Sequence, residues 1–523
     1  MATASELAIN TSANADQMAE AIFGNGVTVV SATYSGDDSS SGIYTGAETT
    51  MPGVAPSDDG VILSTGHASS VTNASGDVNT SSGTSTNTTG ANNDADLNSV
   101  AGFTTYDASI LEATFVPDGD VLTMQIVFSS EEYLEYVGSG FNDAVGIWVN
   151  GVQAELIVGD GSVSINNIND ASNSDLYVDN ASSDDNYNTE MDGFTVTLSL
   201  KAPVTPGAEN TIKIGIADAG DSSYDSNLFI AGNSLQTVVI AEDDEYDIWA
   251  NGQMTIDVLE NDNHDTGGTL SITHINGQAV AAGDTVVLST GVELTLTADG
   301  EIQVLGDDQA SESIFTYTVT DGLGNSDVGY TTINTVPCFL AGTVIDTARG
   351  PLRIDDIAPG DLVLTRDHGY QPVRWAGRKS HECSDRTAPV QIESGTFGLH
   401  GKLVVSPQHR ILIEGPKTEL LFATPEVLVS AIHLIGHAGV RRWPKDRTVT
   451  YVHLLFDQHE VLRSNGIWSE SYLPGPQTMP GFSSEVQSEL CEIFPQLDPL
   501  TGEGYGKAAR MCLKRFEAMA LVA

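Results

Sequence analysis

Basic residues are scarce in the first two thirds of this 523-residue chain. Only Lys201 and Lys213 precede Cys338, whereas 19 of the 21 lysines and arginines lie in the last 186 residues. Of the 71 acidic residues, 50 precede Cys338, so the two parts carry about −48 and −2 charges. Phosphate contacts need lysine and arginine, which excludes nucleic acid as a partner. The acidic part must be solvated in high salt, neutralised by divalent cations, or partly unfolded.

Cysteines and long apolar runs are also few. All four cysteines lie in the near-neutral part, which excludes a disulfide framework in the acidic part: Cys338, Cys383, Cys491 and Cys512. No stretch reaches 18 uncharged apolar residues, so we expect no membrane span. The N-terminus lacks a basic segment followed by an apolar run, so we expect no secretory signal of the usual kind.

Short apolar or alternating runs separated by Gly, Asn, Asp and Ser predict a mainly β, multidomain chain. Residues 1–238 are expected to form a β-sandwich of the jelly-roll kind. Its expected strands are Val27–Ser31, Ile110–Val116, Val121–Phe128, Ala144–Val149 and Thr195–Leu200. Ala13–Phe23 has a helical pattern, and 67–98, rich in Ser, Thr, Asn and Gly, is expected to be a long surface loop or disordered.

Two acidic clusters in this region are candidate calcium sites. Carboxylates beside glycine turns can converge as oxygen ligands for calcium, which tolerates irregular geometry. The candidate ligands are Glu131, Glu132, Asn142, Asp143, Asp218, Asp221 and Asp225. The alternative is that Asp and Asn simply make turns here.

The same stretches, FSSEEYLEYVGSGFNDAVGIWVNG and IADAGDSSYDSNLFI, resemble the choice-of-anchor L domain of bacterial surface and secreted proteins. The resemblance covers about residues 5–238. It implies an extracellular β-sandwich and names no chemistry.

Residues 239–336 are expected to form a second β unit, with hydrophobic alternation at Ile256, Val258, Phe315, Tyr317 and Val319. The segments IDVLENDNHDTGGTLSIT and FTYTVTDGLGNSDVGYTTINTV resemble cadherin-like, immunoglobulin-type modules of bacterial adhesins. By that resemblance the calcium candidates at the module junction are Asp243, Asp244, Asp262 and Asp321. A simple spacer is the alternative.

At Cys338 the composition changes abruptly, and three stretches come after it: CFLAGTVIDT, VVSPQHRILI and VHLLFDQHEVLRSNG. Their composition predicts a compact all-β domain. They resemble the Hint (hedgehog and intein) domain, an all-β horseshoe, over about 337–475. The opening cysteine, the PGDLVLT turn and the SPQHR block carry this resemblance.

The residue types at the start of this domain predict a covalent reaction. The sulfur of Cys338 can attack the carbonyl carbon of Pro337 and turn the scissile amide into a thioester. Because this step is uphill, the site must help through strain on the scissile peptide or donors aimed at the developing oxyanion and leaving nitrogen.

The resemblance assigns roles to two further residues. It implies that His409 protonates the leaving amide nitrogen as a general acid with a pKa near the working pH, and that Ser406 orients the same amide. A structural histidine is the alternative for His409. Where the family's downstream block has an Asp, this chain has His453, so His453, Asp457 and His459 all stay candidates for the base.

The residues after this block distinguish cleavage from splicing. Splicing inteins end in His-Asn, whereas Gly466–Ser471 contains no such pair and the chain continues for about 50 residues. Trp375–Arg378 offers no counterpart to the sterol-activating Asp of hedgehog proteins. We therefore expect cleavage on the N-terminal side alone, without sterol transfer.

Two minor expectations concern zinc and the tail. His433 and His437 are expected to lie four residues apart on a helix and could hold zinc with Cys383 or His453. The tail, 476–523, is expected to be helical, with a capping box at Ser484 and Gln487 and a second helix over Ala508–Leu521 that packs on the Hint domain. Cys491 and Cys512 are expected to be buried helix residues.

Together these patterns predict a secreted or surface protein that cleaves itself before Cys338 and releases its acidic part. Cleavage needs no cofactor, although calcium is expected in the acidic part. The acceptor of the Pro337 acyl group could be water or an outside nucleophile, such as a cell-surface, glycan or protein amine. The alternative is a calcium-binding adhesin or structural surface protein with an inert Hint domain.

Overall fold

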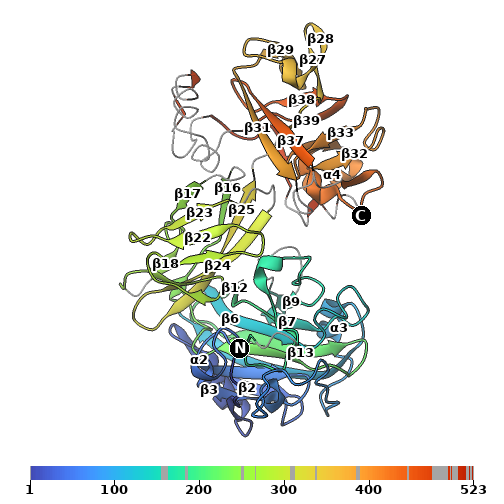
Figure 1. Ribbon diagram of the computed structural model, residues 1–523. Coiled ribbons are helices and arrows are strands. Elements are labelled where there is room, and N and C mark those ends of the chain that lie inside the picture. Colours follow the sequence, from blue (N-terminus) through green and yellow to red (C-terminus); the bar gives the residue numbers. More distant parts are fainter. Residues whose placement is uncertain are drawn as a thin grey trace.

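The structure is a computed structural model, and three β units succeed one another along the chain (Figure 1). It describes residues 2–154, 163–182, 186–248, 253–264, 267–306, 312–335, 339–383, 389–443 and 447–473, and parts of the tail: 490, 493–494, 496–497, 505–513, 517–518 and 521. In the described part of the chain, no helix has the length and apolar character needed to cross a membrane.

The first unit is a sandwich of two sheets. The first sheet contains, in order, β1 (Ala8–Asn10), β3 (Ser41–Thr45), β4 (Asp59–Ser64), β14 (Ser226–Ala231), β6 (Val121–Ser130), β11 (Gly193–Thr195) and β10 (Tyr177–Asp179), with β12 (Leu198–Pro203) also on β6. The second contains β2 (Val27–Ser35), β5 (Thr105–Pro117), β13 (Asn210–Ala219), β7 (Ala144–Val149) and β8 (Val152–Gln153), with β9 (Val163–Ser164) on β7. Four of the five strands expected from the sequence fall in one of these strands, whereas Thr195–Leu200 spans the end of β11 and the start of β12.

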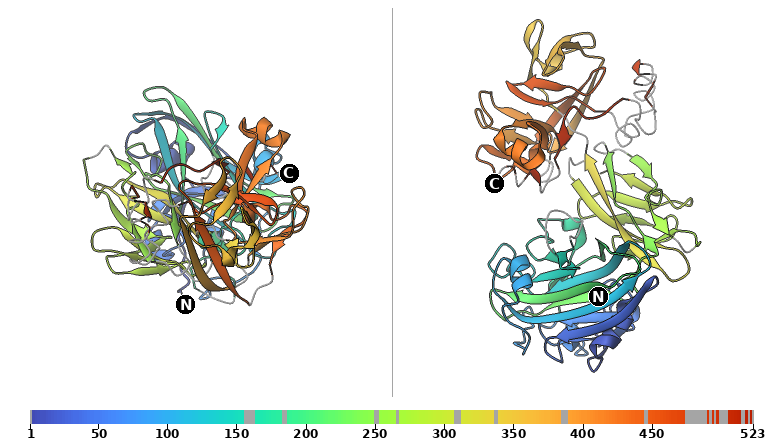
Figure 2. Two further views of the ribbon diagram at one scale, coloured as in Figure 1. Left: turned by 90° about the horizontal axis from the view of Figure 1, so that it is seen from above. Right: turned by 180° about the vertical axis from the view of Figure 1, so that it is seen from behind.

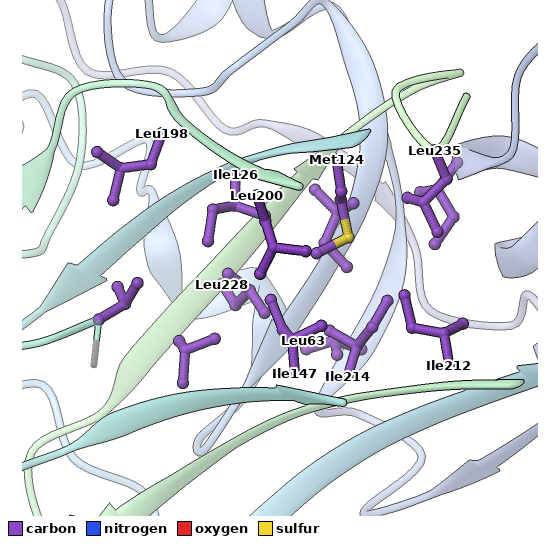
Figure 3. Packing of buried hydrophobic residues seen from close by; sticks show 14 of the residues in the cluster. Leu63, Met124, Ile126, Ile147, Leu198, Leu200, Ile212, Ile214, Leu228 and Leu235 are labelled. Carbon is purple, nitrogen blue, oxygen red and sulfur yellow. The ribbon is translucent and has the colours of Figure 1, made fainter. Parts of the chain in front are cut away.

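The core of this unit lies between the two sheets. Figure 3 shows side chains of the first sheet, such as Met124 and Leu200, facing Ile147 and Ile214 of the second. Alternation along the strands places these residues on the inner faces. The helix α1 (Ala15–Ile22), capped by Asn14 and Gln17, buries its apolar face in the same core.

The remaining helical segments of this unit are short: α2 (Ala47–Thr50), η1 (Ala68–Val71), α3 (Ala95–Ala101) and η2 (Ser174–Leu176). The segment expected to be a loop has no regular structure between η1 and α3 apart from an isolated bridge at Ala91. Many of its backbone and side-chain groups donate hydrogen bonds to carboxylates of the sandwich. These bonds hold the polar segment in one conformation.

The second unit has a five-stranded sheet, a four-stranded sheet and a strand pair. The five-stranded sheet contains β16 (Asp244–Ile248), β25 (Ser326–Thr335), β24 (Glu312–Thr320), β19 (Ser271–Ile275) and β20 (Gln278–Ala279). The others are β17 (Gln253–Ile256), β23 (Ile302–Leu305), β22 (Glu293–Leu296) and β21 (Thr285–Val287), and the pair β15 (Val239–Ile240) and β18 (Asn263–His264).

The first and second units share an extensive interface, and both views of Figure 2 keep the second unit beside the first. Tyr330 of the second unit packs into the core of the first, and its hydroxyl bonds the backbone of Ser199 at 2.7 and 2.9 Å. Asp175 accepts from the Ser289 hydroxyl at 2.6 Å and from the Thr290 amide at 3.0 Å. These contacts attach the second unit to the first. A simple spacer, which was the alternative, would not need side-chain contacts of this kind.

The third unit has two sheets. One contains β31 (Trp375–Cys383), β37 (Arg447–Leu455), β26 (Phe339–Leu340), β33 (Leu403–Val405), β32 (Val390–Ile392) and β36 (Val440–Arg442). The other contains β28 (Gly350–Arg353), β27 (Val344–Thr347), β29 (Leu362–Thr365), β38 (Val461–Ser464), β39 (Ile467–Glu470), β34 (Arg410–Glu414), β35 (Glu426–Ser430) and β40 (Met511–Cys512), with β30 (Gly369–Pro372) on β29. The short helices are η3 (Ile354–Asp356), α4 (Pro416–Phe422) and η4 (Ala431–Leu434).

The tail packs on the third unit as predicted, and Glu517, Ala518 and Leu521 are helical, but the expected second helix does not include Met511 and Cys512. Met511 and Cys512 form β40, which pairs in parallel with Val427 and Leu428 of β35. The half-buried Cys512 is therefore a strand residue. The open edge of β35 offers backbone hydrogen bonds, and these outweigh a weak helical pattern. Ser484, Gln487 and Cys491 lie outside the described residues.

Candidate functional site

The strand register of the third unit gathers its candidate residues around Phe339. This first residue of β26 pairs with Val405 on one side and with Val452 on the other. Ser406 and His453 directly follow these two partners and are 1% and 3% exposed. Pro337 and Cys338 lie outside the described residues, but Phe339 is bonded to Cys338 in the chain. The register therefore brings Ser406 and His453 next to the start of β26.

His409 lies against the same residue. Its ring packs on the ring of Phe339 with centroids 4.3 Å apart. A tight turn fixes its backbone, because the His409 amide donates to the Ser406 carbonyl at 3.1 Å and its carbonyl accepts from Ala431 at 3.0 Å. Ser406, His409 and His453 thus lie next to the start of β26.

The protonation of His409 differs from the expectation. Its side chain is fully buried, and neither ring nitrogen has a hydrogen-bond partner among the described residues. Burial lowers the pKa of His409 to about 4, because the charged imidazolium loses its hydration. The pKa of His409 therefore lies below the expected value near the working pH, and its neutral imidazole form is favoured at neutral pH.

Glu470 is a buried carboxylate near His409 that the sequence analysis did not identify. Glu470, the last residue of β39, is fully buried, and its carboxylate accepts from the Arg410 amide at 2.7 Å. The Arg410 guanidinium lies 3.3 Å from the same carboxylate and His459 Nε2 lies 3.5 Å away. Burial raises the pKa of Glu470, but the charge of Arg410 and the hydrogen bond from His459 outweigh it and hold the pKa at about 2. The only sequence signal was an acid inside a strand-length segment after the Asn465–Gly466 turn.

His459 and Asp457 occupy different surroundings from His409. The Nδ1 atom of His459 accepts from the Ala509 amide at 2.9 Å, so Nε2 carries the hydrogen that it donates to the Ser471 carbonyl at 3.1 Å. Nδ1 therefore holds the tail, whereas Nε2 bonds within the third unit. The side chain of Asp457 is 62% exposed and pairs with Arg374 at 3.3 Å. The structure gives Asp457 no place in the buried cluster, while the buried His453 packs edge-on against Tyr472 with centroids 5.5 Å apart.

The zinc alternative is not supported. The helix expected around His433 ends at Leu434, so His433 and His437 do not share a helix. His437 packs on Phe397 with centroids 5.0 Å apart. Nowhere among the described residues do three or more metal-binding side chains gather into a metal centre, and the side chain of Cys383 lies outside them.

The calcium candidates of the first unit separate into two groups. Asp221 is exposed and closes a turn by accepting from the Ser223 amide, whereas the buried Asn142 accepts from the Asn166 amide, 24 residues further along the chain. The others are at most 2% exposed: Glu131, Glu132, Asp143, Asp218 and Asp225. Burial raises their pKa values, to about 9 for Glu131, 10 for Glu132, 7 for Asp143 and 6 for Asp225, and well above the usual range for Asp218.

The candidates at the junction have protein partners. Asp243 pairs with Lys201 at 3.1 Å, and Asp262 accepts from the Tyr317 hydroxyl at 2.9 Å. Burial raises the pKa of Asp244 to about 7 and that of Asp262 to about 6. Asp321 accepts from the Leu323 and Asn325 amides and so closes a turn. Lys201 already supplies a positive charge at this junction.

Comparison with protein families matches all three units. The family of choice-of-anchor L domains matches residues 7–236, that of bacterial Ig domains matches 236–334, and that of Hint domains matches 337–476. None of the curated proteins compared with the chain matches it.

Solved structures similar to part of the chain include inteins. A splice-inactive variant of the AceL NrdHF class 3 split intein is 17% identical and covers 26% of this chain and 97% of its own, with a TM-score of 0.19. The gp41-1 intein is 16% identical and covers 25% and 97%, with a TM-score of 0.17. By the family matches, the chain contains in this order regions similar to a choice-of-anchor L domain, a bacterial Ig domain and a Hint domain.

Proposed function

We propose that the Hint domain cleaves the chain between Pro337 and Cys338 by an N–S acyl shift. The observation that carries this proposal is the position of Phe339. It is bonded to Cys338, packs on His409, and pairs with the residues that precede Ser406 and His453. The sequence candidates for nucleophile, amide orientation and proton transfer therefore share one neighbour.

In the first step the thiol of Cys338 loses its proton and the sulfur bonds to the carbonyl carbon of Pro337. The bond between that carbon and the amide nitrogen of Cys338 breaks, and the nitrogen leaves as an amine after gaining the proton. His409, neutral and screened from water, accepts the thiol proton at one ring nitrogen and returns a proton to the leaving nitrogen. A neutral imidazole suits this relay because it can both accept and donate.

In the second step water or an outside amine or alcohol attacks the thioester. With water, the acyl carbon gains a hydroxyl and the sulfur regains a hydrogen, which leaves a carboxylate at Pro337 and a free thiol at Cys338. Because Gly466–Ser471 lacks a His-Asn pair, and its Glu470 is held by Arg410 and His459, the second cut of splicing has no group to make it.

The location belongs to the same proposal. A choice-of-anchor L domain at 7–236 and a bacterial Ig domain at 236–334 support an extracellular or surface protein. The cleaved product is then an acidic pair of domains with a carboxylate, ester or amide at Pro337.

The test is to express the full chain and follow it on gels with and without dithiothreitol. We expect fragments of 337 and 186 residues, faster release with the thiol, and no fragments from Cys338→Ala. Mass spectrometry of the fragment ending at Pro337 distinguishes water, amine and alcohol acceptors. A parent chain that stays intact under every thiol condition contradicts the proposal and favours an adhesin with an inert Hint domain.

A further inference from the structure

Two acidic residues face each other at one end of the second sheet of the first unit. In the pairing of β13 with β7, Ala217 lies opposite Ala144. Asp218 follows Ala217 and Asp143 precedes Ala144, so antiparallel geometry carries the two carboxylates to the same place. The Ala219 amide donates to Asp143 Oδ1 at 2.9 Å, in agreement with that register.

The first sheet has the same arrangement. In the pairing of β14 with β6, Ser226 lies opposite Ser130. Asp225 precedes Ser226 and Glu131 follows Ser130, and the Glu131 amide donates to the Asp225 carbonyl at 3.2 Å. Like charges directly opposite each other destabilise a sheet, so each sheet ends in an unfavourable pair.

One hydroxyl connects the two pairs. Ser226 Oγ of the first sheet donates to Asp143 Oδ2 of the second at 2.7 Å. The two acidic pairs therefore lie at the same end of the sandwich. Both oxygens of Asp218 and both of Glu131 are buried without any hydrogen-bond partner among the described residues, as is Oδ2 of Asp225.

The lysines of the acidic part are engaged elsewhere. Lys213 pairs with Asp94 at 3.0 Å and with Asp96 at 2.7 Å, and Lys201 pairs with Asp243 at 3.1 Å. In the part of the chain that the structure describes, no lysine or arginine pairs with the four carboxylates. A buried charge with no partner is costly, so a positive charge from outside the chain is needed.

The polar segment 67–98 covers this end of the sandwich. The Thr86 amide donates to Asp225 Oδ1 at 2.7 Å, and the Asp225 amide donates to the Thr84 carbonyl at 2.9 Å. Gly66, which directly precedes this segment, approaches so closely that an added Cβ would lie 1.8 Å from Asp225 Oδ2. The segment therefore places carbonyl and hydroxyl oxygens beside the carboxylates, and its path depends on where these carboxylates lie.

We propose that this end of the sandwich binds a divalent cation, calcium, at the facing carboxylates of Asp218 and Asp143 together with neutral oxygens. Neutral oxygens are required because no three acidic side chains of the described residues already form a metal centre. Calcium accepts six to eight oxygens, including carbonyls and water, in irregular geometry, whereas magnesium demands a near-ideal octahedron. The ion ties the ends of both sheets to the covering segment.

The test is calorimetry on the full chain carrying Cys338→Ala, with calcium or magnesium added after removal of metal at about pH 7.5. Asp218→Asn keeps the side-chain shape and is expected to weaken calcium binding at least tenfold. Asp221→Asn, the same change three residues away at an exposed turn, is the matched control and is expected to stay within twofold. Magnesium is expected to bind more weakly than calcium.

Hydrogen exchange supplies a second measurement if a variant folds poorly. Calcium is expected to slow exchange in peptides from 73–92 in the parent and in Asp221→Asn, but not in Asp218→Asn. No calcium heat in the parent overturns the proposal and leaves protons as the neutralising species. Equal calcium affinity in Asp218→Asn and the parent overturns it as well, because the ion then binds elsewhere.

Discussion

The pKa values of buried carboxylates are shifted in opposite directions in the first and third units. Glu470 of the Hint domain lies between Arg410 and His459, and its pKa is held at about 2. Asp218 of the choice-of-anchor L domain is equally buried but faces other carboxylates, and burial together with their charge raises its pKa. The difference follows the chain's uneven supply of basic residues. A buried acid is ionised by its protein partners in one unit and depends on protons or added cations in the other.

The largest expected effect comes from breaking the pair in the Hint domain. Glu470→Ala leaves the Arg410 charge without its buried partner, and we expect a loss of about 3–5 kcal/mol in the free energy of unfolding. Denaturant unfolding of the chain carrying Cys338→Ala measures it. Glu393→Ala, which breaks the surface pair with Arg441, is the control and should show no measurable change. A similar small change in Glu470→Ala contradicts the prediction.

The next effect is a pH dependence set by His409. Its pKa is about 4 in the folded protein, against 6.5 for an ordinary histidine, so the unfolded state binds more protons between these values. Stability of the Hint domain should therefore fall by up to about 3 kcal/mol as the pH drops from 6.5 to 4. Glu470 contributes in a separate window, because its depressed pKa removes stability only as the pH falls from about 4.5 to 2.

Unfolding curves at several pH values check this window. His409→Gln removes the titrating group and should flatten the dependence between about pH 6.5 and 4. An unchanged slope in that variant means that another group titrates there.

In the first unit, removing a buried carboxylate should raise the free energy of unfolding instead of lowering it. Asp218→Asn removes a buried carboxyl group whose raised pKa makes it costly at neutral pH, whether it is ionised or has taken up a proton, so without metal at about pH 7.5 we expect a gain of about 1–3 kcal/mol in the free energy of unfolding. Thermal or denaturant unfolding in the presence of a chelator measures it, with Asp221→Asn as the control. A loss of stability in Asp218→Asn would show that its carboxylate already has a favourable partner, as Glu470 has.

The smallest effect is expected for Asp457, whose pair with Arg374 is exposed. Such surface pairs contribute about 0–1 kcal/mol, so Asp457→Asn should leave stability nearly unchanged. It should also leave the rate of cleavage within twofold, whereas His409→Ala should abolish it. A large loss of cleavage in Asp457→Asn restores Asp457 as a catalytic candidate.

Local patterns predicted much of the fold. The alternating runs at Val121–Phe128 and Ala144–Val149 became β6 and β7, and the helical pattern near Ala15 became α1. The prediction of a helix from Ala508 was wrong at Met511 and Cys512 because they pair with β35, and a distant strand edge leaves no mark on the local pattern. In the site, motif spacing found Ser406 and His409, but it found neither Glu470 nor the low pKa of His409.

The sequence by itself determined the order of the three units, the segregation of charge, and the residue types available for a thioester reaction at Cys338. These are properties of composition and short-range pattern, which exist before the chain folds. The tertiary structure decided which charges meet: Glu470 with Arg410 in one unit, and Asp218 with Asp143 in the other. Such meetings depend on strand register between segments some 60 to 80 residues apart, and register is set by the packing of whole sheets.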